Sequence, residues 1–509
     1  MKTLFNMIES LAFNASRIIR TALAGAAIWL VIGWLPAVAQ AQIVVNSNTD
    51  GFVILLPGQP QPCRLRDAIT AANTNLPVGG CVAGVPGLDV IRFDIGTGTP
   101  SIRVRSQLPA IIEEVFIDGG TGGATRVELD GTQASALAGL FGQRVHGLYL
   151  ATGGSTIRNL VINRFNGNGI VMTTDTGGHI SDFTPPTISD PSLPTPPPCF
   201  ARPAEPDCRT GGGGGGGIDI PDFGGADANN KVVGCFIGTD KTGAVAMGNG
   251  SGLDTAGIVT DTDLHTIGGP TPEERNVISG NIGHGLILGG RGHQVIGNFI
   301  GTDASGALAL GNQLDGINIA GGQFSNAVGA IGATSSAIDP QCGLVIDSNG
   351  NVANERRECG NKIAFNGRFG VITGFNRYEM LSNSIFSNGD LGIDVDTGGV
   401  TPNDPVGSSR NFPLLTSRQV VFDSFGRVRT RLGGSITNRS SQRVIIQIFN
   451  NSTCDPSGNG EGSQLVRTLV LTGNGSFSTI VSPVFGVFTA TSTTTGLGSR
   501  QTSEFSLCR

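Results

Sequence analysis

The stretch Phe236-Ile237-Gly238-Thr239-Asp240-x-x-Gly243 returns further along the chain as Phe299-Ile300-Gly301-Thr302-Asp303-x-x-Gly306. A shorter pattern, Asn-x-Ile-x-x-Asn-x-x-x-Gly, recurs between and beyond these copies, and its copies begin at Asn276, Asn361 and Asn383. The last two copies are separated by the same interval that separates Asn276 from Asn298. A fixed period of this length, about 22 residues, predicts a stacked repeat fold.

Each repeat unit holds two short apolar runs with alternating positions, bounded by Asn or Gly, which is typical of strands rather than helices. Such a unit can complete one coil of three short strands and three bends, and stacked coils place neighbouring strands about 4.8 Å apart. The sequence therefore predicts an all-β fold, a right-handed parallel β-helix with about 22 residues per coil. A Gly-rich β-sandwich is the alternative, but it does not account for the preserved phase.

Residues of equal phase are expected to form columns along the stack. The interior column is expected to contain Ile278, Ile287, Ile363, Ile372 and Ile385. A corner of left-handed asparagines, whose amides bond one another in a ladder, is expected at Asn281, Asn366 and Asn388. A second corner with positive φ is expected at Gly285, Gly370 and Gly392. In the longer repeat, Phe-Ile should form core strand, Gly-Thr-Asp a turn, and nine extra residues a loop on one flank.

The N-terminal segment, residues 1–41, predicts a secretory signal peptide. Basic residues precede an apolar run over 22–35, and small residues follow, so cleavage is expected near residue 39 or 41. An uncleaved anchor is the alternative, although a span needs about 20 apolar residues, so no stable membrane span is expected in the mature chain. Removing three basic residues and one acidic residue from totals of 33 and 39 leaves a net charge of −8. This charge disfavours nucleic acid and anionic membranes as partners.

Nine cysteines in an exported chain predict disulfides. Local spacing favours the pairs Cys63–Cys81, Cys199–Cys208, Cys342–Cys359 and Cys454–Cys508, although spacing alone does not establish connectivity. Cys235 remains, and it occupies the place that Asn298 has in the second copy of the long repeat. We therefore expect Cys235 to be a buried free thiol rather than a nucleophile.

The mature chain is expected to contain three parts. Residues 42–112 depart from the repeat and include an amphipathic helix at about 64–73, which would cap the open end of the coils. The coils are expected over 113–405, interrupted by a Pro- and Gly-rich loop at 181–217. Over 406–509 the period is lost, and short alternating strands predict a C-terminal β-sandwich.

These segments resemble a bacterial family across nearly the whole mature length. The run Cys63-Arg64-Leu65-Arg66-Asp67-Ala68-Ile69-x-Ala71-Ala72-Asn73 is similar to the CSLREA domain motif, with Arg64 for its Ser and Asp67 for its Glu. The Ile-Gly-Thr-Asp copies resemble the family's β-helix repeats, and 411–417 and 454–462 resemble its C-terminal sandwich. The resemblance implies exported or surface proteins with a pectin-lyase-like fold and mostly unassigned activity. That fold carries both enzymes and passive surface proteins.

Catalytic candidates are few. Enzymes of this architecture use Ca²⁺ with a basic residue, or paired carboxylates that flank a glycosidic bond. The chain contains no Asp-Asp dipeptide, and His284, between two glycines, is the candidate that resembles a catalytic motif. The repeated Asp240 and Asp303 either accept backbone N–H bonds at a turn, which we favour, or bind a ligand.

A metal site is predicted at Asp394, Asp396, Asn403 and Asp404, because closely spaced oxygen ligands on a Gly-rich turn suit a structural calcium ion. A solvated acidic turn is the alternative interpretation. Asp455 with Glu461 forms a second, weaker candidate in the C-terminal segment.

The function favoured by the sequence is that of an exported surface or binding protein, which binds carbohydrate or a cell-surface partner. The alternatives are a polysaccharide lyase or glycoside hydrolase that acts on an acidic polysaccharide, and a passive cell-envelope protein. Both tryptophans fall in the signal segment, so aromatic sugar contacts would come from phenylalanine. The oligomeric state stays open.

Overall fold

The computed structural model describes residues 40–51, 60–173, 229–320, 326–329, 331–332, 342–346, 352–374, 378–395, 398–408, 410–437, 443–482, 484–494 and 500–509. Residues 1–39 of the predicted signal peptide, the predicted loop 181–217, its cysteine pair Cys199–Cys208, and Asp396 lie outside the described residues. Residues Gln42–Arg509 form one compact unit.

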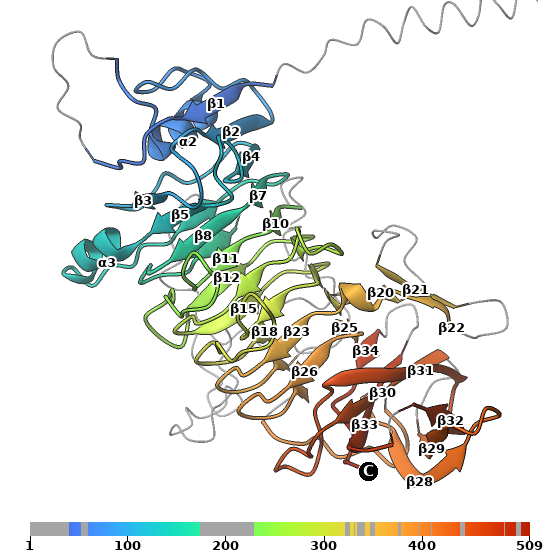
Figure 1. Cartoon of the computed structure of the whole chain (residues 1–509). Coiled ribbons are helices and arrows are strands. Elements are labelled where there is room, and N and C mark those ends of the chain that lie inside the picture. Colours follow the sequence, from blue (N-terminus) through green and yellow to red (C-terminus); the bar gives the residue numbers. More distant parts are fainter. Residues whose placement is uncertain are drawn as a thin grey trace, which may run out of the picture. The chain divides into compact units, whose positions relative to one another are not determined.

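Three parallel sheets dominate this unit, and from β4 onward each coil adds one short strand to each sheet (Figure 1). Sheet 1 contains β1 (Gln42–Val45), β2 (Asp89–Phe93), β4 (Val115–Asp118), β7 (Thr156–Arg158), β10 (Lys231–Val233), β13 (Thr266–Gly268), β16 (Gln294–Ile296), β19 (Asn326–Gly329) and β25 (Tyr378–Leu381). Sheet 2 contains β3 (Ser101–Arg103), β5 (Val127–Asp130), β8 (Leu160–Asn163), β11 (Phe236–Ile237), β14 (Val277–Ile278), β17 (Phe299–Ile300), β23 (Lys362–Ala364) and β26 (Ser384–Phe386). Sheet 3 contains β6 (Leu148–Leu150), β9 (Ile170–Met172), β12 (Ala256–Thr260), β15 (His284–Leu288), β18 (Ile317–Ile319), β24 (Val371–Thr373) and β27 (Ile393–Val395). The predicted mostly β fold with long parallel sheets is confirmed.

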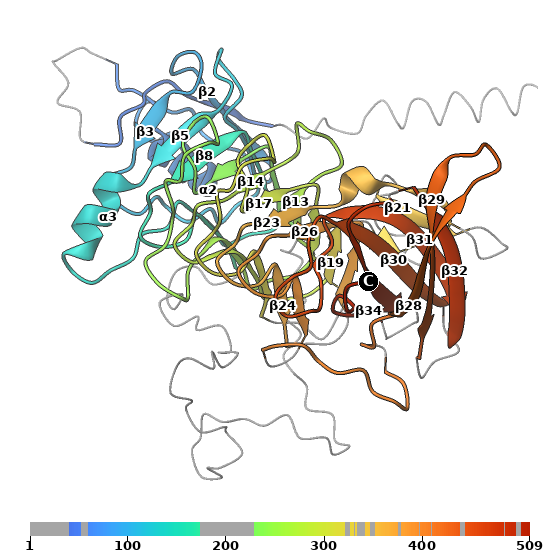
Figure 2. The same ribbon diagram turned by 60° about the horizontal axis from the view of Figure 1, so that its bottom comes forward.

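The parallel ladder begins inside the N-terminal segment 42–112, because β1 and β2 are the first strands of sheet 1. Helix α2 (Leu65–Thr74) packs against these strands and buries Leu65, Ala68, Ile69, Ala71 and Ala72 in the main core. A second helix, α3 (Thr132–Gly139), stands away from the sheets in both ribbon views (Figures 1 and 2).

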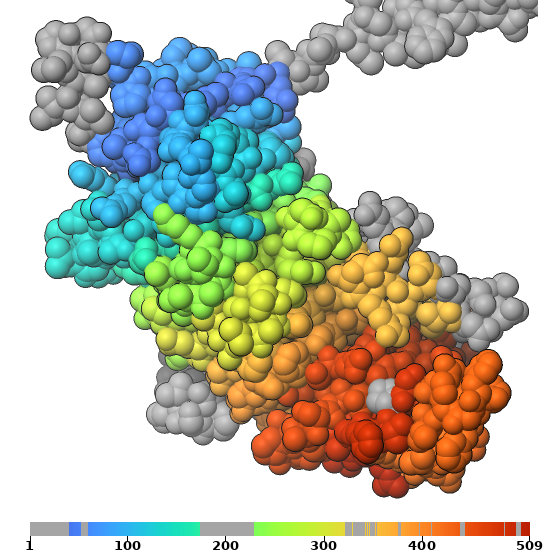
Figure 3. Space-filling model, viewed as in Figure 1, coloured from blue at the N-terminus to red at the C-terminus, as the bar shows by residue number. Residues whose placement is uncertain are grey.

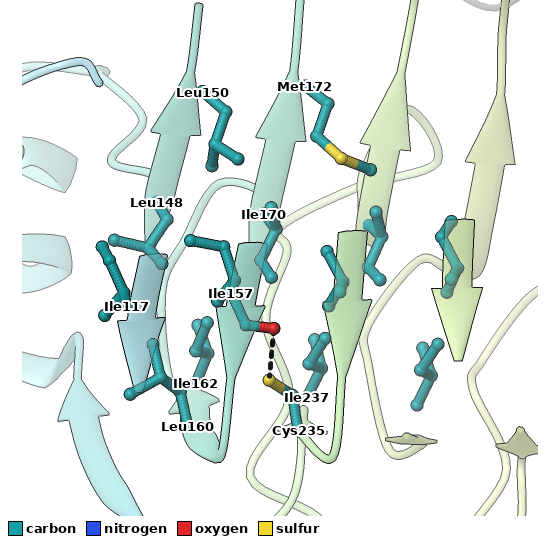
Figure 4. Close-up of a cluster of buried hydrophobic side chains, with 14 of the residues drawn as sticks. Ile117, Leu148, Leu150, Ile157, Leu160, Ile162, Ile170, Met172, Cys235 and Ile237 are labelled. Carbon is teal, nitrogen blue, oxygen red and sulfur yellow. Dashed lines mark hydrogen bonds between the residues drawn. The ribbon is translucent and has the colours of Figure 1, made fainter. Parts of the chain in front are cut away.

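The coil interior is a continuous aliphatic core, part of which is drawn in Figure 4 with Ile162 and Ile237 on neighbouring strands. The predicted interior positions Ile278, Ile363 and Ile385 belong to this core. The prediction is wrong for Ile287 and Ile372, which are buried in separate small clusters. Consecutive strand residues point to opposite faces, and Leu286, Leu288 and Val371 take the interior positions instead.

The predicted asparagine ladder is present. Asn281 donates its amide to Asn312 Oδ1 at 2.9 Å, Asn312 to Asn366 at 2.9 Å, and Asn366 to Asn388 at 3.0 Å. The expected left-handed backbone at these asparagines is wrong, because the left-handed residue comes one position earlier, as at Phe365 with φ 61°. The corner is therefore made before the Asn, whose own N–H is free to donate along the ladder, from Asn366 to Asn388 at 3.2 Å.

The glycine column has a different cause from the one predicted. Gly285, Gly370 and Gly392 do not have positive φ. A Cβ on Gly370 would lie 2.5 Å from the carbonyl oxygen of Gly392 and 3.0 Å from Asn388 Nδ2. Glycine is required because each coil approaches the next one and the asparagine ladder too closely for any side chain.

Beyond residue 410 the chain forms antiparallel sheets. One contains β28 (Leu414–Phe422), β29 (Val428–Ile436) and β32 (Gly475–Val481), and the other contains β31 (Gln464–Thr472), β30 (Arg443–Asn451), β33 (Val487–Thr494) and β34 (Gln501–Thr502). The two sheets share a hydrophobic core that includes Leu432, Ile446, Phe477 and Phe488. A small sheet precedes them, with β20 (Ile331–Gly332), β21 (Gly343–Ile346) and β22 (Val352–Glu355), followed by the 3-10 helix Arg357–Cys359.

The C-terminal sheets lie directly against the last coils, as the orange and red surface in Figure 3 shows. Ile385 of β26 and Gly462 exchange two backbone hydrogen bonds, of 2.9 Å and 2.7 Å. Phe449 and Phe505 belong to the same core cluster as the coil interior. The C-terminal segment thus continues the packing of the coils.

Candidate functional site

The long repeat forms two loops of the same design. In both copies Phe-Ile forms the expected strand of sheet 2. In the second copy, Ile300 enters the interior core, whereas Phe299 lies on the opposite face of the sheet. Adjacent residues of one strand cannot share a face. A Cβ on Gly306 would lie 2.6 Å from the Phe299 ring, and the Arg275 guanidinium lies 4.3 Å from its centre. The first copy repeats the arrangement with Ile237, Phe236, Gly243 and Arg126.

The repeated aspartates hold these loops. Asp303 Oδ1 accepts the backbone N–H groups of Ala307 at 3.1 Å and Leu308 at 3.0 Å, and Asp240 Oδ1 accepts the equivalent two groups at 3.0 Å and 3.1 Å. Burial alone would raise the pKa of Asp303, but the bonds from Leu308, Ser305 and Ala307 outweigh it and lower the pKa. Both carboxylates therefore act as acceptors of backbone N–H groups at a turn.

The two loops also lie on the same flank and touch. Ala304 donates its backbone N–H to the carbonyl of Gly243 at 2.9 Å. The hydroxyl of Ser305 donates to Asp303, as that of Thr242 donates to Asp240. The polar groups of each loop are therefore used to hold its own conformation and that of its neighbour.

Replacing Asp303 by alanine should lower the free energy of unfolding by about 1 kcal/mol, because two partly buried hydrogen bonds from backbone N–H groups of the loop are lost. Asp303→Asn is the matched control, since it keeps an oxygen at the same place. Urea unfolding of both variants tests this, and an Asp303→Ala protein as stable as the parent would contradict the role of the carboxylate.

His284 is the buried first residue of β15 and is held by protein atoms on both sides. Its Nε2 lies 3.0 Å from the carbonyl of Leu253, and its Nδ1 lies 3.0 Å from Asp315 Oδ2, without the alignment of a hydrogen bond. Asp315 in turn accepts the backbone N–H of Phe369 at 3.2 Å.

Residues that directly precede the column glycines make similar side-chain to backbone contacts in other coils. His146 Nδ1 accepts the backbone N–H of Asn168 at 3.0 Å, and Asn168 Oδ1 accepts that of Ala256 at 2.8 Å. His284 and Asp315 immediately precede two members of the glycine column, as His146 and Asn168 do. The structure therefore gives His284 a place in a polar corner column, and catalysis by His284 stays the alternative that the sequence did not favour.

The calcium ligands predicted from the sequence are Asp394, Asp396, Asn403 and Asp404, of which Asp396 lies outside the described residues. Asp394 accepts the backbone N–H of Gly399 at 3.2 Å. The amide of Asn403 bonds the backbone of Phe412 twice, and Asp404 accepts a backbone N–H within its own turn. Across the described residues, no three His, Cys, Asp or Glu side chains are grouped as metal ligands. Calcium stays a prediction.

Three disulfides join Cys63 to Cys81, Cys342 to Cys359, and Cys454 to Cys508, the pairs that local spacing favoured. Cys235 is a buried free thiol in the asparagine position, and its backbone N–H donates to Asn276 Oδ1 at 2.9 Å. Burial raises the pKa of Cys235 to about 12, so the thiol stays protonated and unreactive at neutral pH.

A hollow of about 450 Å³ lies between β22, β31 and β32, and we call it the β31 hollow. Its lining includes the apolar residues Val352, Val466, Val470 and Phe477 and the polar residues Glu355, Arg357, Arg467, Thr468 and Ser478. These residues come from segments far apart in the chain and carry no repeat or motif, so sequence reasoning missed them.

The polar wall of the β31 hollow is ordered around Glu355. Its carboxylate accepts the hydroxyl of Thr468 at 2.6 Å and the amide of Gln447 at 3.0 Å, and it pairs with Arg357 at 3.1 Å. Arg467 is exposed, and its side chain has no hydrogen bond or ion pair with any described residue. The hollow therefore offers one uncommitted cation, Arg467, on the face of β31 opposite to that of the bonded pair Glu355 and Thr468.

The fold and this hollow define a mostly β protein of parallel β-helix-like construction with an antiparallel C-terminal part. No family model matches the chain, and no curated protein matches it. Within the described segments, no helix combines the length and the apolar character that crossing a membrane requires.

Proposed function

We propose that the mature chain is an exported surface protein that binds carbohydrate through its C-terminal segment. In this proposal residues 42–112 form a CSLREA-like cap, the coils form a right-handed parallel β-helix, and 406–509 form a β-sandwich. The observation that carries the proposal is the β31 hollow, whose volume lies in the range of small-ligand sites. Its hydroxyl, carboxylate and guanidinium groups beside apolar side chains provide the mixture that sugars require.

The three disulfides support the exported location, because such bonds persist in oxidising compartments. The predicted signal peptide agrees with this compartment. The loops of the long repeat have their polar groups committed to their own conformation, which makes them a poorer site for a ligand than the hollow.

Filling the hollow should abolish binding. Ser478→Trp places an indole in the β31 hollow, and we expect at least about tenfold weaker glycan binding, since a bulky side chain excludes the ligand. Ser476→Trp, on the same strand and equally exposed, is the matched control outside the hollow. Calorimetric titration against acidic and neutral glycans measures the difference, and thermal melting checks that both variants fold.

The same glycan panel separates the alternatives. Robust depolymerisation by the purified mature chain would replace binding with a lyase or hydrolase activity. Absence of binding and turnover for every glycan would favour a passive envelope protein or a protein partner at the cell surface.

A further inference from the structure

The C-terminal segment carries a charge opposite to that of the rest of the mature chain. Residues 406–509 contain ten arginines, no lysine and four acidic residues, which gives a formal charge of +6. Residues 42–405 contain 20 basic and 34 acidic residues, which gives −14. The overall negative charge therefore conceals a strongly cationic segment.

The few acidic groups of this segment are mostly committed to structure. Glu461 and Glu504 accept backbone N–H groups of the last coil, at 3.0 Å from Asn388 and 3.1 Å from Val395. Asp423 pairs with Arg427 at 2.8 Å. These carboxylates are thus not available to neutralise the remaining arginines on the surface.

Two arginines near the β31 hollow are free to meet a ligand. Arg467 lines the hollow, and Arg431 lies on β29 opposite Ile480, two residues from the lining residue Ser478. Both arginines are exposed and have no hydrogen bond or ion pair with a described residue. Arginine presents a planar fork of donors that binds carboxylate or sulfate with two parallel bonds, which lysine does not.

We propose that the β31 hollow and its arginine rim bind an anionic polysaccharide, with Arg467 as the principal contact to its acidic groups. This inference rests on the proposed carbohydrate function and names the ligand class. The negative coils would repel a polyanion, so its binding is confined to the cationic segment. Glu355 and Thr468 bond each other on the opposite face of β31, which leaves the guanidinium of Arg467 free of a competing carboxylate on its own face.

Three polymers on one backbone test this ligand class: dextran, carboxymethyl-dextran and dextran sulfate. We expect the mature chain to bind both charged polymers and not dextran, with affinity that falls steeply as salt rises. Arg467→Gln should weaken binding at least about tenfold, and Arg467→Lys should recover part of the loss. Arg291→Gln removes one arginine of the coils and should leave binding unchanged, which controls for net charge.

The outcomes separate the two proposals. Salt-insensitive binding of a neutral glycan that Arg467→Gln leaves intact would overturn the anionic class but keep the carbohydrate function. Lack of binding to every glycan would overturn both. Equally tight binding of a duplex DNA of the same charge density would overturn the polysaccharide and indicate general polyanion binding.

Discussion

Replacing Phe505 by alanine is expected to lower the free energy of unfolding by about 3–5 kcal/mol, as for other buried aromatic residues. The variant should also associate end to end, because the ring closes the core of the last coil. Phe505 is 2 % exposed and packs edge-on against Phe449, with ring centres 5.4 Å apart. A Cβ on Gly392 would lie 3.0 Å from the Phe505 ring, so the aromatic side chain occupies the place of the next coil.

The asparagine ladder ends in the same region, on Glu461. Its carboxylate accepts the backbone N–H of Asn388 at 3.0 Å and the amide of Asn388 at 3.3 Å, and it also accepts the N–H of Ser387. Glu461 therefore accepts the hydrogen bonds of Asn388, the last residue of the ladder, just as Asn388 accepts those of Asn366. The predicted pairing of Glu461 with Asp455 at a metal site is a weaker explanation of this residue.

Glu461→Ala should accordingly lower the free energy of unfolding by about 2–4 kcal/mol, because it leaves these donors of the last coil without an acceptor. Glu461→Gln keeps one oxygen acceptor and should lose less than half of that amount. Urea unfolding gives the energies, and light scattering after size-exclusion chromatography gives the oligomeric state of both variants and of Phe505→Ala. A Phe505→Ala protein that is monomeric and as stable as the parent would show that the end of the coils needs no cover.

An open end would associate because the last strands of three sheets present unpaired backbone groups. In the described chain β25, β26 and β27 are the terminal strands of sheets 1, 2 and 3. The C-terminal segment covers this end with hydrogen bonds to Ile385 and apolar contact through Phe505. If this cover were removed, the exposed strands of one molecule could pair with those of a second copy, which explains the expected end-to-end association.

The sequence predicts the coils well because they are periodic, and it predicts their ends poorly because ends are not. Asn281, Asn366 and Asn388 can be aligned by phase alone, whereas their ladder partner Asn312 is displaced by the inserted loop. Glu461 meets Asn388 across 73 residues, and nothing local in either segment indicates that contact. The β31 hollow is equally non-local, since its walls come from three separate segments.

The errors of prediction concern side-chain direction rather than position. The glycines at 285, 370 and 392 do form a column, but a repeated glycine does not reveal whether φ or close approach requires it. Phe299 and Ile300 are both apolar and lie in one strand, and strand parity allows only Ile300 into the core. The sequence does hold one signal that Phe299 faces outward: the aromatic residue and the glycine seven positions after it, Gly306, recur together in both copies of the long repeat.

The buried histidines predict a loss of stability in mild acid. In one column Asn230 Oδ1 accepts the N–H of Ser155 at 2.9 Å, and His265 Nδ1 accepts the N–H of Asn230 at 3.1 Å. His293 Nδ1 accepts the N–H of His265 at 3.3 Å, and the two rings stack 5.3 Å apart. Each imidazole thus imitates an asparagine oxygen, and it can do so only while Nδ1 carries no proton.

Burial lowers the pKa of His265 to about 3, with a contribution from His293, and lowers the pKa of His293 to about 4. Between about pH 6 and 4.5 the unfolded chain binds protons at both histidines and the folded chain does not, so stability falls as pH falls. Each group contributes a slope of about 1.4 kcal/mol per pH unit. His146 adds an effect of the same sign, because burial and then Arg144 lower its pKa to about 4.

Glu504 opposes this trend. Burial, with Asp394 nearby, raises the pKa of Glu504 to about 7. Its contribution to the free energy of unfolding is therefore complete below about pH 4.5 and is lost as pH rises toward 7. Its slope of about 1.4 kcal/mol per pH unit cancels that of one histidine, and Glu461, whose pKa burial also raises, acts in the same direction. The three histidines together leave a net loss of stability on acidification.

His293→Asn isolates the histidine effect, because Asn230 already shows that an asparagine serves in this column. We expect the variant to lie within about 1 kcal/mol of the parent at pH 8 and to lose about 1.4 kcal/mol per pH unit less between pH 6 and 4.5. Urea unfolding at half-unit pH steps measures both slopes. Parallel curves for parent and variant would mean that the folded protein accommodates a protonated His293, and that its Nδ1 is not the acceptor that holds this corner.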